Sequence, residues 1–224
     1  MGSKNRIAKY ILPLMLKERK PNQCFVDIFC GGCNIVDKVG GNRIANDINK
    51  YLIAMFKELV NGWNPPLFVS KDEYLEIKNN KGNYPDYLVG YVGFNSFGAR
   101  FFNTYRNDER GLRTYWTEYY NNLMKQIPNL KNIIFENKSY DELKLPENSL
   151  IYCDPPYQNT TKYKDEINYD RFWNWCIEKK NEGHTIFISE LKAPEQFKCI
   201  WSKDLLATTS MNNYKTQTER LFTC

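Results

Sequence analysis

The four residues Asp154, Pro155, Pro156 and Tyr157 directly follow the apolar run 150–153 of this 224-residue chain. An ionised aspartate only accepts hydrogen bonds, and so does the carbonyl oxygen of a proline. Because proline has no N–H and a fixed φ, the segment is rigid and its carbonyls can point at a ligand. Asp154 and Pro155 together can therefore accept both hydrogens of an amino group.

An amino group held in this way becomes a better nucleophile. The exocyclic amine of adenine is a poor one, because its lone pair is delocalised into the ring, and two acceptors on its hydrogens favour a pyramidal nitrogen. Attack on an activated methyl group then needs positioning and charge stabilisation, with no metal or covalent nucleophile. Tyr157 adds an aromatic face against which an extruded base can stack. The alternative is a plain proline-rich connection after a strand.

A turn with two glycines supplies a second candidate site. Gly31 and Gly32 follow the apolar run 24–29, and we expect the chain to pass through them from a strand into a helix. Glycine lets the backbone approach a bound cofactor, and a helix amino terminus favours electron-rich groups. The sequence lacks the full G-x-G-x-x-G dinucleotide pattern, so a simple connection is the competing interpretation.

Asp47 follows the next expected strand, 43–46. It comes roughly twenty residues after Asp27 in the sequence, which is the separation at which dinucleotide-binding folds carry an acidic residue. An acid there can accept hydrogen bonds from the ribose hydroxyls of an adenosine-containing cofactor. Asp47 could equally cap the helix expected to begin near Asn49. The sequence leaves both interpretations open.

The elements that must position these residues alternate along the chain. Short apolar runs rich in β-branched and aromatic residues predict buried parallel strands at 24–29, 43–46, 133–135, 150–153 and 185–189. Apolar residues at helical spacing predict helices over 7–16, 48–60 and 169–180. Strands that alternate with helices indicate an α/β fold with a sheet covered on both faces.

Residues 64–122 break this alternation, and we expect them to form an inserted subdomain between two parts of one catalytic domain, 1–63 and 123–224. Aromatic residues, Asn, Gly and Arg dominate the stretch, a mixture suited to phosphate contacts, base-edge hydrogen bonds and stacking. The candidate DNA contacts are Asn95, Arg100, Tyr105, Arg106 and Arg113. A solvated face around a small aromatic core is the alternative. Lys162 and Tyr163, in the loop after the tetrapeptide, are candidates for closing on an extruded base.

The composition of the chain bears on its possible partners, on metal and disulfide sites, and on membrane segments. The formal net charge of +5 is compatible with a polyanionic partner but does not require one. Seven scattered cysteines argue against a disulfide framework, and Cys30 and Cys33 lack the second pair that a zinc site needs, so we expect no metal. No run approaches the roughly 18 apolar residues of a membrane helix, and residues 1–10 lack the apolar block of a signal peptide. We therefore expect a cytoplasmic protein without membrane contact.

In this order, the cofactor turn, the insertion and the Asp-Pro-Pro-Tyr tetrapeptide resemble the Dam-type DNA adenine methyltransferases, particularly the small versions of bacteriophages and prophages. The resemblance runs nearly end to end. It implies an α/β, Rossmann-like class I methyltransferase sheet, mostly parallel with a C-terminal antiparallel hairpin, flanked by helices and carrying a small DNA-recognition insertion. It also implies S-adenosyl-L-methionine as cofactor, the N6 amino group of a flipped adenine in double-stranded DNA as acceptor, and a monomer or weak dimer in a bacterial or phage-infected cell.

The resemblance also implies roles for single residues. Lys4, within segment 2–6, matches the family's amino-terminal cofactor contact, and segment 136–141 looks like the motif that flanks the cofactor adenine. Cys33 stands where the family usually has glycine. The implied cofactor-binding residues are Lys4, Asp27, Phe29, Gly31, Gly32, Asp47, Ile48, Ser139, Tyr140 and Asp154, and the implied catalytic residues are Asp154, Pro155, Pro156 and Tyr157. Segments 188–190 and 218–222 look like later strands of the family's core.

Competing functions stay open at this point. A cytosine N4-methyltransferase solves the same chemical problem, and an RNA methyltransferase would act on structured RNA in place of duplex DNA. A protein-glutamine methyltransferase resembles this group but has Asn in place of Asp154. An inactive DNA-binding relic would usually lose the tetrapeptide or the glycine turn, and an NAD-dependent oxidoreductase would carry the dinucleotide pattern. The target sequence is also open, and GATC is only a family-level expectation.

Overall fold

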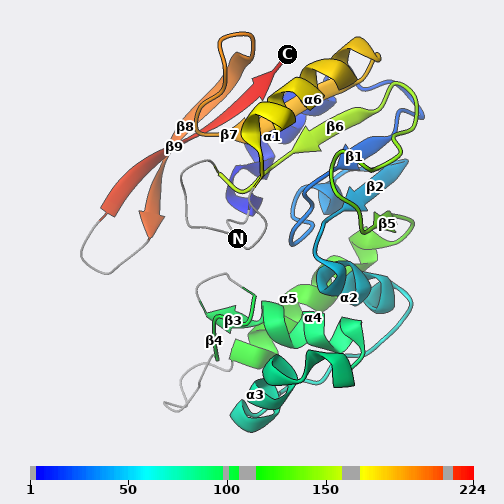
Figure 1. Ribbon diagram of the computed structural model, residues 1–224, viewed down its shortest axis with the longest axis vertical. Helices are drawn as coiled ribbons and strands as arrows, with labels where there is room; N and C mark the ends of the chain where they lie inside the picture. The colour runs from blue at the N-terminus through cyan, green and yellow to red at the C-terminus, as the bar shows by residue number, and fades with distance from the viewer. Residues whose placement is uncertain (1–3, 98–100, 106–114, 158–166, 209–213) are drawn as a thin grey trace.

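The computed structural model describes residues 4–97, 101–105, 115–157, 167–208 and 214–224 (Figure 1). Its centre is a seven-stranded sheet in the order β5-β2-β1-β6-β7-β9-β8. The strands are β1 (Phe25–Asp27), β2 (Arg43–Asn46), β5 (Ile134–Glu136), β6 (Leu150–Cys153), β7 (Thr185–Glu190), β8 (Lys198–Thr208) and β9 (Tyr214–Thr223). Neighbouring strands from β5 to β7 are parallel, and β9 is antiparallel to both β7 and β8. The predicted mostly parallel sheet with a C-terminal antiparallel hairpin is confirmed.

The central strands are buried because helices cover both faces of the sheet. Along β1, Phe25 and Val26 belong to two different hydrophobic clusters, as expected when alternate residues point to opposite faces. One cluster includes apolar residues of α1 (Asn5–Leu16) and α2 (Lys50–Val60), and the other includes those of α6 (Tyr169–Asn181). The predicted sheet with two covered faces is confirmed, and the three predicted helices form within two residues of their expected bounds.

The crossover from β1 to β2 differs from the prediction. We expected a helix after Gly31 and Gly32, but the chain forms only a three-residue 3₁₀ turn there, η1 (Val36–Lys38). Gly31 and Cys33 have positive φ angles of 46° and 57°, so the backbone reverses direction instead of continuing as a helix. The crossover packs in the same hydrophobic cluster as α1, which supplies the helical cover on this face.

The described part of residues 64–122, which we expected to form an insertion and call the insertion below, lies at the end of the molecule remote from α6 (Figure 1). Its elements are α3 (Lys71–Asn79), η2 (Lys81–Asn83), α4 (Asp86–Phe94), β3 (Ser96–Phe97), β4 (Thr104–Tyr105) and α5 (Tyr115–Leu130). Helix α5 runs unbroken across the boundary expected after residue 122. Helix α4 crosses α2 closely at Gly90, where a Cβ atom would lie 2.1 Å from the carbonyl oxygen of Tyr51. Buried residues of the insertion therefore belong to the same cluster as α1 and α2.

Two further findings concern the parts of the chain described above. None of their helices is long and apolar enough to cross a membrane. They also contain no group of three or more His, Cys, Asp or Glu side chains that could hold a metal ion.

Candidate active site

The tetrapeptide lies where the strand order of the sheet changes direction. Strand β1 is flanked by β2 on one side and by β6 on the other, so the chain winds outward from β1 in both directions. Asp27 at the end of β1 is in register with Tyr152 of β6, two residues before Asp154. The carboxyl ends of these strands thus share one edge. In open α/β sheets, ligands bind at the carboxyl edge beside such a switch point.

An ammonium group from the start of the chain joins two carboxylates at this edge. The Nζ atom of Lys4 lies 3.3 Å from Oδ1 of Asp154 and 3.0 Å from Oε2 of Glu219. It also donates to the hydroxyl of Tyr157, and that hydroxyl donates to Oε2 of Glu219 at 2.5 Å. Four residues from three distant parts of the chain therefore form one hydrogen-bonded group.

Burial determines the charge balance of this group. It raises the pKa of Asp154 to about 6, although Lys4 acts in the opposite direction. Burial alone would lower the pKa of Lys4, but the charges of Asp154 and Glu219 outweigh it and raise that pKa. The side chain of Asp154 is still 20% exposed, so a ligand can reach it. Near neutral pH the site holds a reachable carboxylate beside an ammonium group.

The two proline carbonyls of the tetrapeptide have different surroundings. The carbonyl of Pro156 accepts a hydrogen bond from the hydroxyl of Tyr169, which also lies 2.9 Å from Oε1 of the buried Glu190. The carbonyl of Pro155 has no hydrogen-bond partner among the described residues. Pro155 therefore retains the free acceptor that the sequence argument requires beside Asp154.

Asp47 ties the glycine turn to the start of α2. Its Oδ2 atom accepts from the backbone N–H of Gly31 at 3.1 Å, and its Oδ1 atom accepts from that of Asn49 at 2.9 Å. Burial raises the pKa of Asp47, and these two hydrogen bonds oppose the rise. The side chain that caps α2 is Asn49, which accepts from the N–H groups of Tyr51 and Leu52. The capping role considered for Asp47 therefore belongs to Asn49.

Asp27 is buried beside the same turn and has an unpartnered oxygen. Its side chain is 2% exposed, and Oδ1 has no hydrogen-bond partner in the described part of the chain. Burial raises the pKa of Asp27 well above its usual value, and the charge of Asp154 adds to the rise. A buried acceptor without a donor is costly, so this oxygen favours a ligand that brings a donor or a positive charge.

The other predicted cofactor residues lie along the same edge. Ile48 is 57% exposed next to Asp47, and the side chain of Asn137 donates to the carbonyls of both. The rings of Phe29 and Tyr140 lie 5.7 Å apart between their centroids. The hydroxyl of Ser139 contacts Asp141. Gly32 lies in the turn and accepts from Gln126 of α5.

The structure gives less support to the predicted DNA contacts. Asn95 is 1% exposed, so its amide cannot reach a base edge in this structure. Tyr105 packs against Tyr74 and Trp116 and donates its hydroxyl to the carbonyl of Val69. Tyr105 therefore serves the aromatic core of the insertion, which was the alternative interpretation. Asn95 is buried, and neither atom of its amide has a hydrogen-bond partner among the described residues. The predicted contacts Arg100, Arg106, Arg113, Lys162 and Tyr163 lie outside the described residues.

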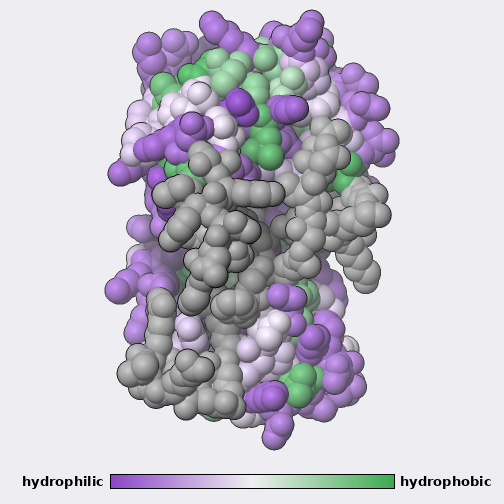
Figure 2. Space-filling model, turned by 90° about the vertical axis from the view of Figure 1, so that its left-hand side faces the viewer, coloured by the Kyte–Doolittle hydropathy of each residue, from purple (hydrophilic) through white to green (hydrophobic). Residues whose placement is uncertain are grey.

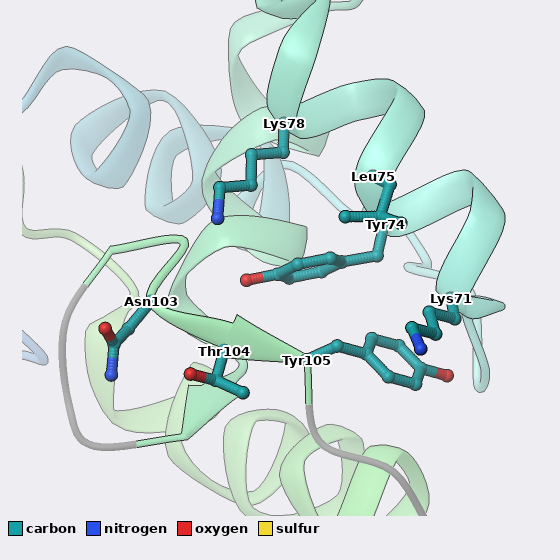
Figure 3. Close-up of a pocket in the computed structure, with 7 residues that line it drawn as sticks. All are labelled: Lys71, Tyr74, Leu75, Lys78, Asn103, Thr104 and Tyr105. Atoms are coloured by element: carbon teal, nitrogen blue, oxygen red, sulfur yellow. The ribbon is translucent and has the colours of Figure 1, made fainter.

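A separate cavity of about 300 Å³ lies within the insertion, between α3 and β4 (Figure 3). It is lined by Lys71, Tyr74, Leu75, Lys78, Asn103, Thr104 and Tyr105. Figure 3 shows the ring of Tyr74 lying across it, with the amino group of Lys78 on one side. The hydroxyl oxygen of Tyr74 is covered and lacks a partner among the described residues. No residue of the Asp154 group lines this cavity, so we do not assign the chemistry to it.

Glu219, Tyr169 and Glu190 were not among the residues predicted from sequence. Glu219 shares a face of β9 with Leu221, which is buried in the same cluster as Tyr152. An acidic residue at a buried position of a strand was the available signal. Sequence alone could not supply the partner, because Lys4 lies more than two hundred residues away along the chain.

Comparison with known proteins places these observations in a family. Residues 1–217 match the family model described as D12 class N6 adenine-specific DNA methyltransferase. The chain is 29% identical over 209 residues to the modification methylase StsI of Streptococcus sanguinis, covering 80% of this chain and 31% of that protein. It is 26% identical over 213 residues to the type II methyltransferase M.FokI of Planomicrobium okeanokoites, and this match covers 80% of this chain and 32% of that protein. The chain thus spans about a third of the length of these relatives.

Solved structures give more distant matches. The rRNA methyltransferase aviRa from Streptomyces viridochromogenes is 11% identical with a TM-score of 0.44, and the match covers 98% of this chain and 84% of that one. SMU.472, described as a methyltransferase complexed with SAH, is 14% identical with a TM-score of 0.44, and the match covers 99% and 52%.

Proposed function

Because this chain belongs to the D12 class of N6-adenine-specific DNA methyltransferases, we propose that it transfers a methyl group from S-adenosyl-L-methionine to the N6 nitrogen of an adenine extruded from duplex DNA. One observation carries the proposal. Asp154 is reachable and next to the Pro155 carbonyl, which has no partner among the described residues. The two acceptors match the two hydrogens of an exocyclic amine.

The acidic character of the site fits a cationic cofactor. Lys4 is shared between Asp154 and Glu219, and Asp27 is close enough to Asp154 for its pKa to be affected. The unpartnered oxygen of Asp27 favours a ligand that brings a hydrogen-bond donor or a positive charge. S-adenosyl-L-methionine supplies an activated methyl group on a sulfonium when bound. We assign its ribose to Asp47 and its adenine to the exposed side chain of Ile48.

The residues of this chain then position the acceptor. Asp154 and Pro155 hold the amine, and Tyr157 stacks on the base. A bound cofactor would supply the methyl group. The adenine nitrogen that receives it loses one N–H proton, and Asp154, which accepts a hydrogen bond from this N–H, can take that proton. Asp154 favours this change because its negative charge faces the nitrogen on which positive charge develops. Rate enhancement comes from orientation and preorganised charge.

We assign DNA recognition to the insertion and to the loop after the tetrapeptide. Arg100, Arg106 and Arg113 are the proposed contacts in residues 64–122, and Lys162 and Tyr163 are those in the loop. The β3–β4 hairpin and the β8–β9 hairpin project toward the same side in Figure 1. Seen from that side in Figure 2, the described surface combines hydrophilic residues with hydrophobic ones that gather in its upper part. We propose a cytoplasmic monomer or weak dimer acting on duplex DNA.

The test is methyl transfer from tritiated S-adenosyl-L-methionine to unmethylated duplex DNA, followed by nucleoside analysis. We expect N6-methyladenine, whereas N4-methylcytosine would replace this proposal by the cytosine enzyme. Asp154→Ala should abolish transfer and keep cofactor affinity within a few-fold, as measured by calorimetry, since the lost acceptor is needed for the amine. Asp47→Ala should weaken cofactor binding first. Near-normal turnover of Asp154→Ala would contradict the mechanism.

A further inference from the structure

The aromatic ring of the tetrapeptide is anchored by a strand from the opposite end of the sequence. The hydroxyl of Tyr157 donates to Oε2 of Glu219, and the same oxygen accepts from Lys4. We propose that Glu219 is a positioning residue that fixes the ring of Tyr157 against the target base. The proposal rests on the proposed function and adds to it a residue of β9.

Burial makes this arrangement more than a surface ion pair. The side chains of Lys4 and Glu219 are 9% and 13% exposed, so removing the charge of Lys4 would leave Glu219 poorly compensated. One carboxylate oxygen receives both the ammonium and the phenol. Glu219 is therefore the acceptor that Lys4 and Tyr157 share.

The phenol bond also restricts the ring of Tyr157. A tyrosine ring attached only through its Cβ can rotate about two side-chain torsions. With its hydroxyl held by Lys4 and Glu219, and with Lys4 Nζ 4.2 Å from the ring centroid, both ends of the side chain are fixed. A ring held before the base arrives stacks on it without an additional ordering cost.

Glu219 also competes with Asp154 for one ammonium. Lys4 bonds both carboxylates, and the charge of Glu219 makes ionisation of Asp154 harder. Replacing Glu219 by Gln removes a negative charge but keeps an acceptor oxygen, so Asp154 would be the only one of the two carboxylates left beside Lys4. The acid limb of the activity profile, set by Asp154, should then move to lower pH. A residue with a purely structural role would not move this limb.

The experiment compares Glu219→Gln, Tyr157→Phe and the double variant in the full chain. We expect each single variant to lower kcat on the order of tenfold with little change in the KM for the cofactor, and the double variant to be no worse than either single one. Fluorescence of 2-aminopurine placed at the methylated position should show weaker stacking in both single variants. The matched control is Asp204→Asn, which removes a carboxylate of the same hairpin that bonds Thr218 instead of Lys4.

Two outcomes would overturn the proposal. The first is that Glu219→Gln keeps the wild-type kcat and an unmoved acid limb. The second is that the reductions in kcat of Glu219→Gln and Tyr157→Phe multiply in the double variant. Failure of the proposed function would be separate, because the wild-type chain would then give no N6-methyladenine. In that case NMR of tyrosine-labelled protein still decides the point: ring signals of Tyr157 should broaden in Glu219→Gln if Glu219 holds the ring, and stay unchanged if it does not.

Discussion

A carboxylate that must accept hydrogen bonds is useful only while it is ionised, and Asp154 is held close to that limit. Burial raises its pKa to about 6, and Lys4 keeps it from rising further. In the proposed mechanism this burial is an advantage, because water around the carboxylate would compete with the amine for its lone pairs. Lys4 would then keep a largely buried acceptor ionised.

This balance predicts the pH dependence of turnover. At saturating cofactor and DNA, kcat should fall on the acid side with a midpoint near pH 6, since protonated Asp154 loses an acceptor position. Lys4 lowers the pKa of Asp154, so Lys4→Gln should move the midpoint to higher pH, opposite to the shift expected for Glu219→Gln. Single-turnover methyl transfer, followed at a series of pH values, measures this midpoint. Lys9→Gln, on the exposed part of α1, should leave the midpoint where it is, and equal midpoints in all four proteins would contradict the assignment to Asp154.

Residues of the site differ in how far the sequence could predict them. Asp154 to Tyr157 are contiguous, so their types and order alone indicated an amine-binding loop. Glu219 and Glu190 meet the loop only because β9 and β7 are adjacent in the sheet, a neighbourhood that no local pattern contains. Asn95 is a case of the opposite kind. The basic and aromatic residues around it in the sequence predicted an exposed side chain, but the fold places it in the interior.

The same contrast holds for whole elements. The parallel strands were predictable because a strand covered on both faces is a continuous apolar run, and β2 and β6 have the expected bounds. The crossover after β1 was not predictable, because two glycines are compatible with either the start of a helix or a sharp reversal of the backbone. The reversal occurs since Gly31 and Cys33 both take positive φ. The glycine turn is therefore held by Asp47, which also accepts from the N–H of Asn49, and not by a helix of its own.

The contact between α2 and α4 gives a prediction at this scale. A methyl group at Gly90 would lie 2.1 Å from the carbonyl oxygen of Tyr51 in α2, so Gly90→Ala must push the helices apart. We expect a loss of about 1–3 kcal/mol in the free energy of unfolding, measured by urea denaturation. The KM for the cofactor should rise as well, because α2 begins next to Asp47. Gly82→Ala is the matched control, since its added methyl meets no atom within 4 Å. Equal losses in both variants would show that the helix contact is not the cause.

At the scale of the whole molecule, one hydrophobic cluster extends from the sheet into the insertion. It contains residues of α1, α2, α4 and α5 together with Tyr152 of β6. The insertion is therefore packed onto the sheet and does not hang from it by a linker. If the insertion contacts DNA as proposed, a contact made by its described residues would hold the duplex at a fixed position relative to Asp154.

The salt dependence of DNA binding is a test of where the duplex lies. If the insertion binds the phosphate backbone, the logarithm of the DNA Kd should rise linearly with the logarithm of the salt concentration. Arg106→Ala should reduce that slope by about 0.9 if this side chain contacts one phosphate. Lys180→Ala is the control of equal charge change, because Lys180 lies in the last turn of α6, at the end of the molecule remote from the insertion. Fluorescence anisotropy with a labelled duplex at several salt concentrations gives both slopes. If Lys180→Ala lowered the slope and Arg106→Ala did not, the duplex would have to lie over the α6 end, and the recognition role of residues 64–122 would be wrong.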